Sequence, residues 1–119
     1  MIEKKITIEG REYKLRSSAL IPKLYRAEFG RDMIADMRGL TKAYRDTKGD
    51  PDKMLAVADL EIFERAAWIM MKHAGEDVGE TPDEWLESLN GVFSVYEVLP
   101  VILELWNFNN KTTSVPRKK

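Results

Sequence analysis

The stretch LYRAEFGRDM, residues 24–33, decides how the chain folds. Tyr25 and Phe29 lie four residues apart, so they share one face of a helix. Gly30 follows at the position where the end of a helix favours a left-handed residue, and Asp32 stands where it can cap a second helix. The stretch therefore predicts a tight joint between two helices. Because Gly30 is isolated, with no G-x-G-x-x-G or G-K-[ST] motif in the chain, the pattern argues against a phosphate-binding loop.

Helical patterns extend from this joint along the chain. The first predicted helix begins at about Pro22, because proline is tolerated in a first turn, and ends at Phe29. The second carries apolar residues spaced four and three apart, which are Met33, Met37, Leu40 and Tyr44. The third predicted helix, from Pro51 to His73, is the longest and carries two apolar stripes, one of which includes Phe63. Phe63 and Trp68 are both expected to be buried.

A hairpin is predicted before these helices, and two further helices after them. Two alternating segments flank the turn Glu9-Gly10, and the predicted cross-strand pairs are Ile6–Tyr13, Ile8–Arg11 and Lys4–Leu15. Thr81-Pro82-Asp83-Glu84 predicts a capping box at the start of a short helix. Residues 92–108 predict an apolar helix that bends at Pro100. The expected fold class is therefore mainly α with a small N-terminal β-hairpin (α+β), as a compact bundle of four or five helices.

The chain is expected to form a single helical domain over residues 1–108, followed by a disordered basic tail over residues 109–119. The tail lacks apolar periodicity and ends in Pro116-Arg117-Lys118-Lys119. The apolar segment before it is shorter than the roughly 20 residues of a membrane span, so no membrane partner is expected. The N-terminus does not resemble a signal peptide, which predicts a cytoplasmic location.

The composition predicts binding rather than catalysis. The chain has no cysteine, which excludes disulfides, thiolate catalysis and cysteine-based zinc sites. His73 is the only histidine and has no ligands or nucleophile at suitable spacing, so we expect no catalytic residue, no metal and no cofactor. A formal net charge of −1 provides no electrostatic footprint for nucleic acid. A small helical DNA-binding or regulatory protein is one alternative, and a salt-sensitive gel shift would support it. A small enzyme subunit is the other, and a metal or cofactor bound to the purified protein would support it.

Tryptophan and methionine are numerous for so short a chain. Three tryptophans and six methionines suggest a partner-binding surface beside the core. The C-terminal apolar segment is where we expect self-association or partner contact, through Val95, Leu99, Leu103, Trp106 and Phe108. An open edge of the hairpin would offer a second route to homo-oligomers.

Three stretches, in this order, resemble a known family: LYRAEFGRDM, LEIFERAAWIMMKHA and TPDEWLESLNGVFSVYEVLPVILELWNFNNKTTSVPRKK. They are similar to the tail assembly chaperones of long-tailed phages and prophages of Gram-positive bacteria, over nearly the whole chain and by order and spacing. The resemblance implies a small, helical, self-associating protein that is not an enzyme. Such a protein binds and solubilises the tape measure protein in the cytoplasm of the bacterial host, helps recruit tail tube subunits, and is absent from the mature virion. The resemblance also implies a longer product made by ribosomal frameshifting near Lys118-Lys119.

Overall fold

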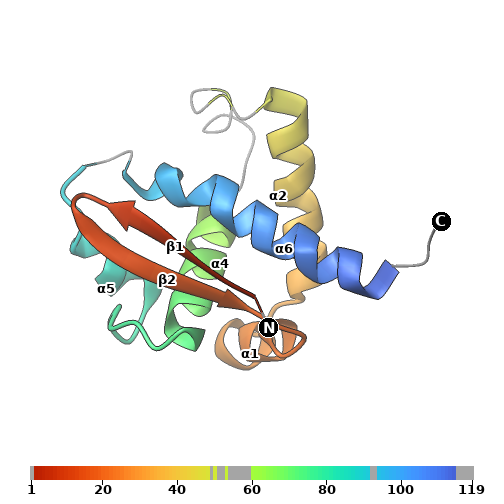
Figure 1. Cartoon of the computed structure of the whole chain (residues 1–119), viewed down its shortest axis with the longest axis horizontal. Coiled ribbons are helices and arrows are strands. Elements are labelled where there is room, and N and C mark those ends of the chain that lie inside the picture. Colours follow the sequence, from red (N-terminus) through yellow and green to blue (C-terminus); the bar gives the residue numbers. More distant parts are fainter. Residues whose placement is uncertain (1, 49, 51–52, 54–59, 92–93, 115–119) are drawn as a thin grey trace.

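The hairpin and the helices follow one another in the expected order in the computed structural model, which describes residues 2–48, 50, 53, 60–91 and 94–114 (Figure 1). The elements are β1 (Ile2–Ile8), β2 (Arg11–Ser17), α1 (Ile21–Phe29), α2 (Met33–Thr47), α4 (Leu60–His73), α5 (Pro82–Glu87), the 3₁₀ helix η1 (Ser94–Val98) and α6 (Leu99–Ser114). This order confirms the predicted α+β fold class. Most of the first part of the third predicted helix, residues 51–59, lies outside the described residues.

Strands β1 and β2 form an antiparallel hairpin in the predicted register. The opposed residues include Ile6–Tyr13, Ile8–Arg11 and Lys4–Leu15. Glu9 and Gly10 both have positive φ, at 53° and 81°, which is the conformation of a type I′ turn and matches the twist of the strands. The face that carries Tyr13 and Leu15 is buried and packs against the helices, which stabilises an otherwise marginal two-stranded sheet.

Helix α4 lies at the centre of the core. It contacts β2, α1, α2, α5 and α6, and Figure 1 shows it behind the hairpin. Phe63 and Trp68 are 1% and 0% exposed, and the predicted burial of both is confirmed. The indole N–H of Trp68 donates to the carbonyl of Val78 at 3.3 Å, so the loop after α4 closes over this ring.

Helix α5 begins with the predicted N-cap. The hydroxyl of Thr81 accepts the N–H of Glu84 at 3.2 Å, and the Glu84 carboxylate accepts the N–H of Glu80 at 3.2 Å. The first bond satisfies an N–H group of the first turn. The second differs from a capping box, because it reaches the N–H of the residue before the N-cap Thr81. The helix thereby presents Trp85, 1% exposed, to the hairpin, where its ring meets Tyr13 edge-on with 6.4 Å between centroids.

The C-terminal segment differs from the single bent helix predicted for residues 92–108. Helix η1 comes first and α6 follows it, so Pro100 lies in the first turn of α6 instead of at a bend. Proline is accommodated there because first-turn N–H groups have no partner within the helix. The backbone of α6 continues to Ser114, so the boundary predicted at residue 108 between domain and tail falls inside a helix. Residues 115–119 lie outside the described part.

Helix α6 packs against the hairpin and α4. It contacts β1, β2, η1 and α4, and in Figure 1 it runs diagonally across the molecule between the hairpin and α2. Ile102 and Leu105 are both fully buried in the common core. None of the described helices is long and apolar enough to span a membrane.

Candidate functional site

The joint between α1 and α2 is closed by a buried carboxylate that the sequence pattern did not single out. Asp36, in the first turn of α2, is 6% exposed. The hydroxyl of Tyr25 donates to its Oδ2 at 2.8 Å. Arg31 donates to both of its oxygens, from Nε to Oδ2 at 2.7 Å and from Nη2 to Oδ1 at 2.8 Å. This bidentate pairing ties α1 and the linker to α2.

Gly30 and Asp32 end one helix and begin the next at the positions the sequence predicts. Gly30 has φ 68° and its N–H donates to the carbonyl of Arg26 at 2.8 Å. Oδ1 of Asp32 accepts the N–H of Ile34 at 2.9 Å, which satisfies a donor in the first turn of α2. The chain therefore changes direction within three residues.

The groups of the joint are each held in one protonation state. Hydrogen bonds from Arg31 and then from Tyr25 outweigh burial and lower the pKa of Asp36. Burial, followed by the neighbouring Asp36 carboxylate, raises the pKa of the Tyr25 hydroxyl. Tyr25 thus keeps its proton, and Asp36 stays ionised with both oxygens occupied. Such a network positions helices, whereas a general base needs an oxygen that can reach a substrate proton.

Aromatic rings fasten the joint to α4. Tyr25 and Phe29 meet edge-on with 5.0 Å between centroids, and Phe29 meets Trp68 of α4 in the same way at 5.9 Å. The guanidinium of Arg65 lies 5.8 Å from the centroid of the Phe29 ring. The four residues predicted as a structural joint therefore lie together in the structure, and they are Tyr25, Phe29, Gly30 and Asp32.

Substitution of the glycine tests the conformation of this joint. Gly30→Ala is expected to lower the free energy of unfolding by about 1–2 kcal/mol, because a Cβ is disfavoured at positive φ. Gly39→Ala is the matched control, since an added Cβ would meet no described atom within 4 Å at either glycine, but Gly39 lies inside α2. Alanine there should stabilise the fold by roughly 0.5–1 kcal/mol. Urea unfolding measures both, and effects of the same sign would contradict a left-handed Gly30.

The residues predicted for partner contact lie along α6 and η1. Leu99, Leu103 and Trp106 are 4%, 6% and 5% exposed and belong to the main core cluster. The side chains of Val95 and Phe108 fall outside the described part of the chain. In this fold the chain's own hairpin and helices cover the first three residues. A partner can reach them only if α6 moves away from the hairpin.

Polar contacts hold α6 and the segment before it against the hairpin. Lys4 on β1 forms an ion pair with Glu104 on α6. At the hairpin turn, the carboxylate of Glu9 accepts three donors, which are the N–H groups of Asn90 and Gly91 at 2.9 and 2.6 Å and the hydroxyl of Ser94 at 2.5 Å. These bonds, that of Asn90 first, lower the pKa of Glu9. The hairpin is therefore bonded both to the segment that precedes α6 and to the middle of α6 itself.

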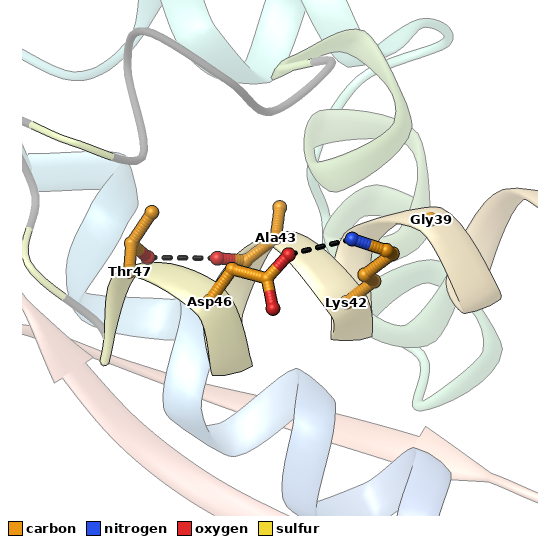
Figure 2. A pocket seen from close by; sticks show the side chains of 5 residues that line it. All are labelled: Gly39, Lys42, Ala43, Asp46 and Thr47. Atoms are coloured by element: carbon orange, nitrogen blue, oxygen red, sulfur yellow. Dashed lines mark hydrogen bonds and ion pairs between the residues drawn. The ribbon is translucent and has the colours of Figure 1, made fainter.

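A shallow hollow of about 320 Å³ lies beside the second half of α2 (Figure 2). Its lining residues are Gly39, Lys42, Ala43, Asp46 and Thr47. Figure 2 shows that their polar groups pair with one another. Lys42 lies 2.7 Å from Asp46, and the Thr47 hydroxyl donates to the carbonyl of Ala43 at 2.8 Å. A ligand would compete with these bonds, so the hollow does not form a candidate site.

His73 connects the end of α4 to the segment before α1. Its Nε2 lies 3.3 Å from the hydroxyl of Ser18. Burial, and then the charge of Arg16, lower the pKa of His73, so the imidazole is neutral at neutral pH. Within the described ranges, no group of three or more His, Cys, Asp or Glu side chains could hold a metal ion.

Comparisons with known proteins provide no further assignment. No family model, no curated protein and no solved structure matches the chain. A functional hypothesis therefore depends on the sequence resemblance and on the contacts described above. Those contacts place Leu99, Leu103 and Trp106 of α6 in the core and fasten the joint between α1 and α2 to α4.

Proposed function

We propose that the chain is a phage tail assembly chaperone, which binds and solubilises the tape measure protein and helps recruit tail tube subunits. In this proposal it acts by binding, without catalysis or a cofactor, in the cytoplasm of the bacterial host, and it is not part of the mature virion. It forms homo-oligomers and has no nucleic-acid or membrane partner. The proposal rests first on the resemblance, which spans nearly the whole chain.

The residues that carry the resemblance also hold the fold together. Phe29, from the first of the three quoted stretches, packs against Trp68, from the second. Trp85, from the third, packs against the hairpin, and Trp106 is buried in α6. Residues far apart in the sequence thus meet in one core. The residues that carry the resemblance therefore belong to one core, and this observation supports the proposal most strongly.

The carboxylates of Asp36 and Glu9 each accept several hydrogen bonds, all from groups of the same chain. Asp36 accepts bonds from Tyr25 and Arg31, and Glu9 accepts backbone N–H groups of the loop before η1. Both carboxylates have lowered pKa values for that reason. Their hydrogen-bonding capacity is used for positioning. These two carboxylates are therefore not available as a general acid or base.

Helix α6 is the element through which we propose that the chain contacts the tape measure protein. Its apolar face, with Leu99, Leu103 and Trp106, packs inside the free chain. Binding through this face would exchange contacts within the chain for contacts with an apolar partner. A partner shifts the chain towards the state in which this face is exposed only to the extent that it binds that state more tightly than the closed one. The ion pair between Lys4 and Glu104 is a weak restraint, because both side chains are about two-fifths exposed.

A covalent tether between α6 and the hairpin tests this mode of binding. Because the chain contains no cysteine, the variant Lys4→Cys/Glu104→Cys has a single thiol pair that a short bismaleimide can link. We expect the linked protein to lose its ability to suppress aggregation of the tape measure protein after dilution from denaturant, measured by light scattering. The unlinked variant should keep this ability. The control is Lys42→Cys/Asp46→Cys, linked across one turn of α2.

The outcomes separate the binding mode from the function. Full activity of the tethered protein, together with activity of the control, would exclude contact through the inner face of α6. If the unmodified chain does not slow aggregation of the tape measure protein at any molar ratio, the chaperone function itself is contradicted.

A further inference from the structure

The pairing of the hairpin determines which backbone groups point to its two outer edges. In a two-residue hairpin, the residues that flank the turn form a hydrogen-bonded pair, and such pairs alternate with non-hydrogen-bonded ones. Ile8 and Arg11 flank the turn. The N–H and C=O groups that point outward therefore belong, on β1, to Glu3, Lys5 and Thr7 and, on β2, to Glu12, Lys14 and Arg16.

The outer edge of β2 is closed by the loop that follows α4. The N–H of Lys14 donates to Oε2 of Glu76 at 2.7 Å, in agreement with its outward direction. Beside it, Nη2 of Arg11 donates to the carbonyl of Asp77 at 3.3 Å. A carboxylate that occupies the central N–H of an edge prevents a further strand from pairing there.

The outer edge of β1 is open. Within the described part of the chain, no hydrogen bond from outside β2 reaches its outward-pointing backbone groups. Helix α6 contacts both strands and η1 contacts β1, but no backbone hydrogen bond joins either helix to the outward groups of β1 in the described part of the chain. The inner face is also less covered on this side, because Ile2 and Ile6 are only half-buried whereas Tyr13 and Leu15 on β2 are 2% and 0% exposed.

We propose that two copies of this chain dimerise by antiparallel pairing of their β1 edges, with Glu3 of one copy opposite Lys5 of the other. In this register the outward N–H and C=O groups of both residues are paired. Glu3 and Lys5, which also pair with Arg16 and Glu12 of their own chain, then bring opposite charges face to face twice. On the inner face, Ile2 lies opposite Ile6 of the second copy, so the half-buried isoleucines cover one another. The next register would place Lys5 opposite Lys5 of the second copy, where like charges repel.

The proposed dimer is a closed assembly. Lys4 lies on its two-fold axis, where the ion pair with Glu104 of its own chain offsets the repulsion between the two lysines. The combined sheet ends on both sides at β2, whose edge Glu76 occupies. Pairing of β1 therefore stops at two copies and does not propagate into a fibre.

Sedimentation equilibrium with charge-reversal variants tests this dimer. We expect a monomer–dimer equilibrium that Glu3→Lys weakens about tenfold, because two pairs of opposite charges become pairs of like charges. The double variant Glu3→Lys/Lys5→Glu restores opposite charges and should return the dissociation constant to within about threefold of the wild-type value. The control Glu12→Lys changes the same exposed face on β2 and should leave the dimer unchanged. Circular dichroism establishes that each variant is folded.

Amide hydrogen exchange then locates the interface. The N–H groups of Glu3 and Lys5 should be protected at concentrations where the dimer predominates and exchange freely on dilution. Those of Lys4 and Ile6, which pair with β2, should be protected in both conditions. A chain that stays monomeric at millimolar concentration, a dimer whose Glu3 and Lys5 amides exchange freely, or a charge reversal without effect would each overturn the proposal. These results bear on the homo-oligomer of the proposed function and leave its contact with the tape measure protein, which is tested through α6, untouched.

Discussion

Truncation of Trp68 to alanine is expected to lower the free energy of unfolding by about 3–5 kcal/mol, the range for a large aromatic residue in a core. The ring is fully buried in α4. It meets Phe29 of the joint edge-on, and its N–H donates to the carbonyl of Val78. The substitution therefore removes contacts to α1 and to the loop after α4 at once. Urea unfolding followed by far-UV circular dichroism measures the change.

Two further variants separate packing from the hydrogen bond. Trp68→Phe keeps most of the apolar volume and loses the bond to Val78, so it should destabilise the fold less than Trp68→Ala does. Phe63→Ala, at a site 1% exposed on the same helix, should approach the effect of Trp68→Ala. If Trp68→Ala and Phe63→Ala both unfold at the urea concentration of the wild type, α4 is not the centre of the core.

Replacement of Asp36 by alanine is expected to lower the free energy of unfolding by about 2–3 kcal/mol, because it leaves a buried hydroxyl without an acceptor. Tyr25, the donor, is 0% exposed. Arg31 contributes less to this cost, because its side chain is 46% exposed and water can solvate it. The matched control is Asp46→Ala, which removes an exposed carboxylate from the same helix and should leave the unfolding curve unchanged.

The pH dependence of stability gives the same network a second signature. The pKa of Asp36 is lowered in the folded chain, so its contribution to stability is present above the unfolded value of about 4 and is lost as the pH falls through the folded value. The difference in stability between the wild type and Asp36→Asn should therefore shrink below about pH 4. A difference that stays constant from neutral to acidic pH would contradict the role of the ionised carboxylate.

Local sequence signals predict the hairpin register and the helix ends well, because each depends on a few neighbouring residues. A two-residue turn at Glu9-Gly10 permits one register, and the alternation around it decides which face is buried. Gly30 and Asp32 predict the joint because one tolerates positive φ and the other accepts first-turn N–H groups. These signals do not depend on how the helices pack.

The partners of buried polar groups depend on tertiary packing and are harder to predict. Asp36 resembles a solvated helix residue until α1 folds back and brings Tyr25 to it. One signal was present, since Asp36 lies on the same helical face as Met33, Met37 and Leu40. A carboxylate on an apolar face requires a donor, and Arg31 is the nearest strong donor before it in the sequence.

The C-terminal segment shows a second limit of sequence patterns. Pro100 is compatible both with a bend and with a helix start, because proline disrupts only N–H groups that have a partner inside the helix. The apolar face of α6 is compatible both with a core and with a binding surface, because apolarity does not specify what covers it. The structure places Leu99, Leu103 and Trp106 in the core of the free chain.

Co-expression with the tape measure protein of the same phage or prophage tests the proposed function most directly. The measured quantity is the fraction of tape measure protein in the supernatant after cell lysis and centrifugation, with the chain, without it, and with the destabilised variant Trp68→Ala. We predict that the tape measure protein is soluble and co-purifies with the chain only when the chain is present and folded. The same soluble fraction of tape measure protein in all three strains, with no complex recovered, would contradict the assignment as a chaperone.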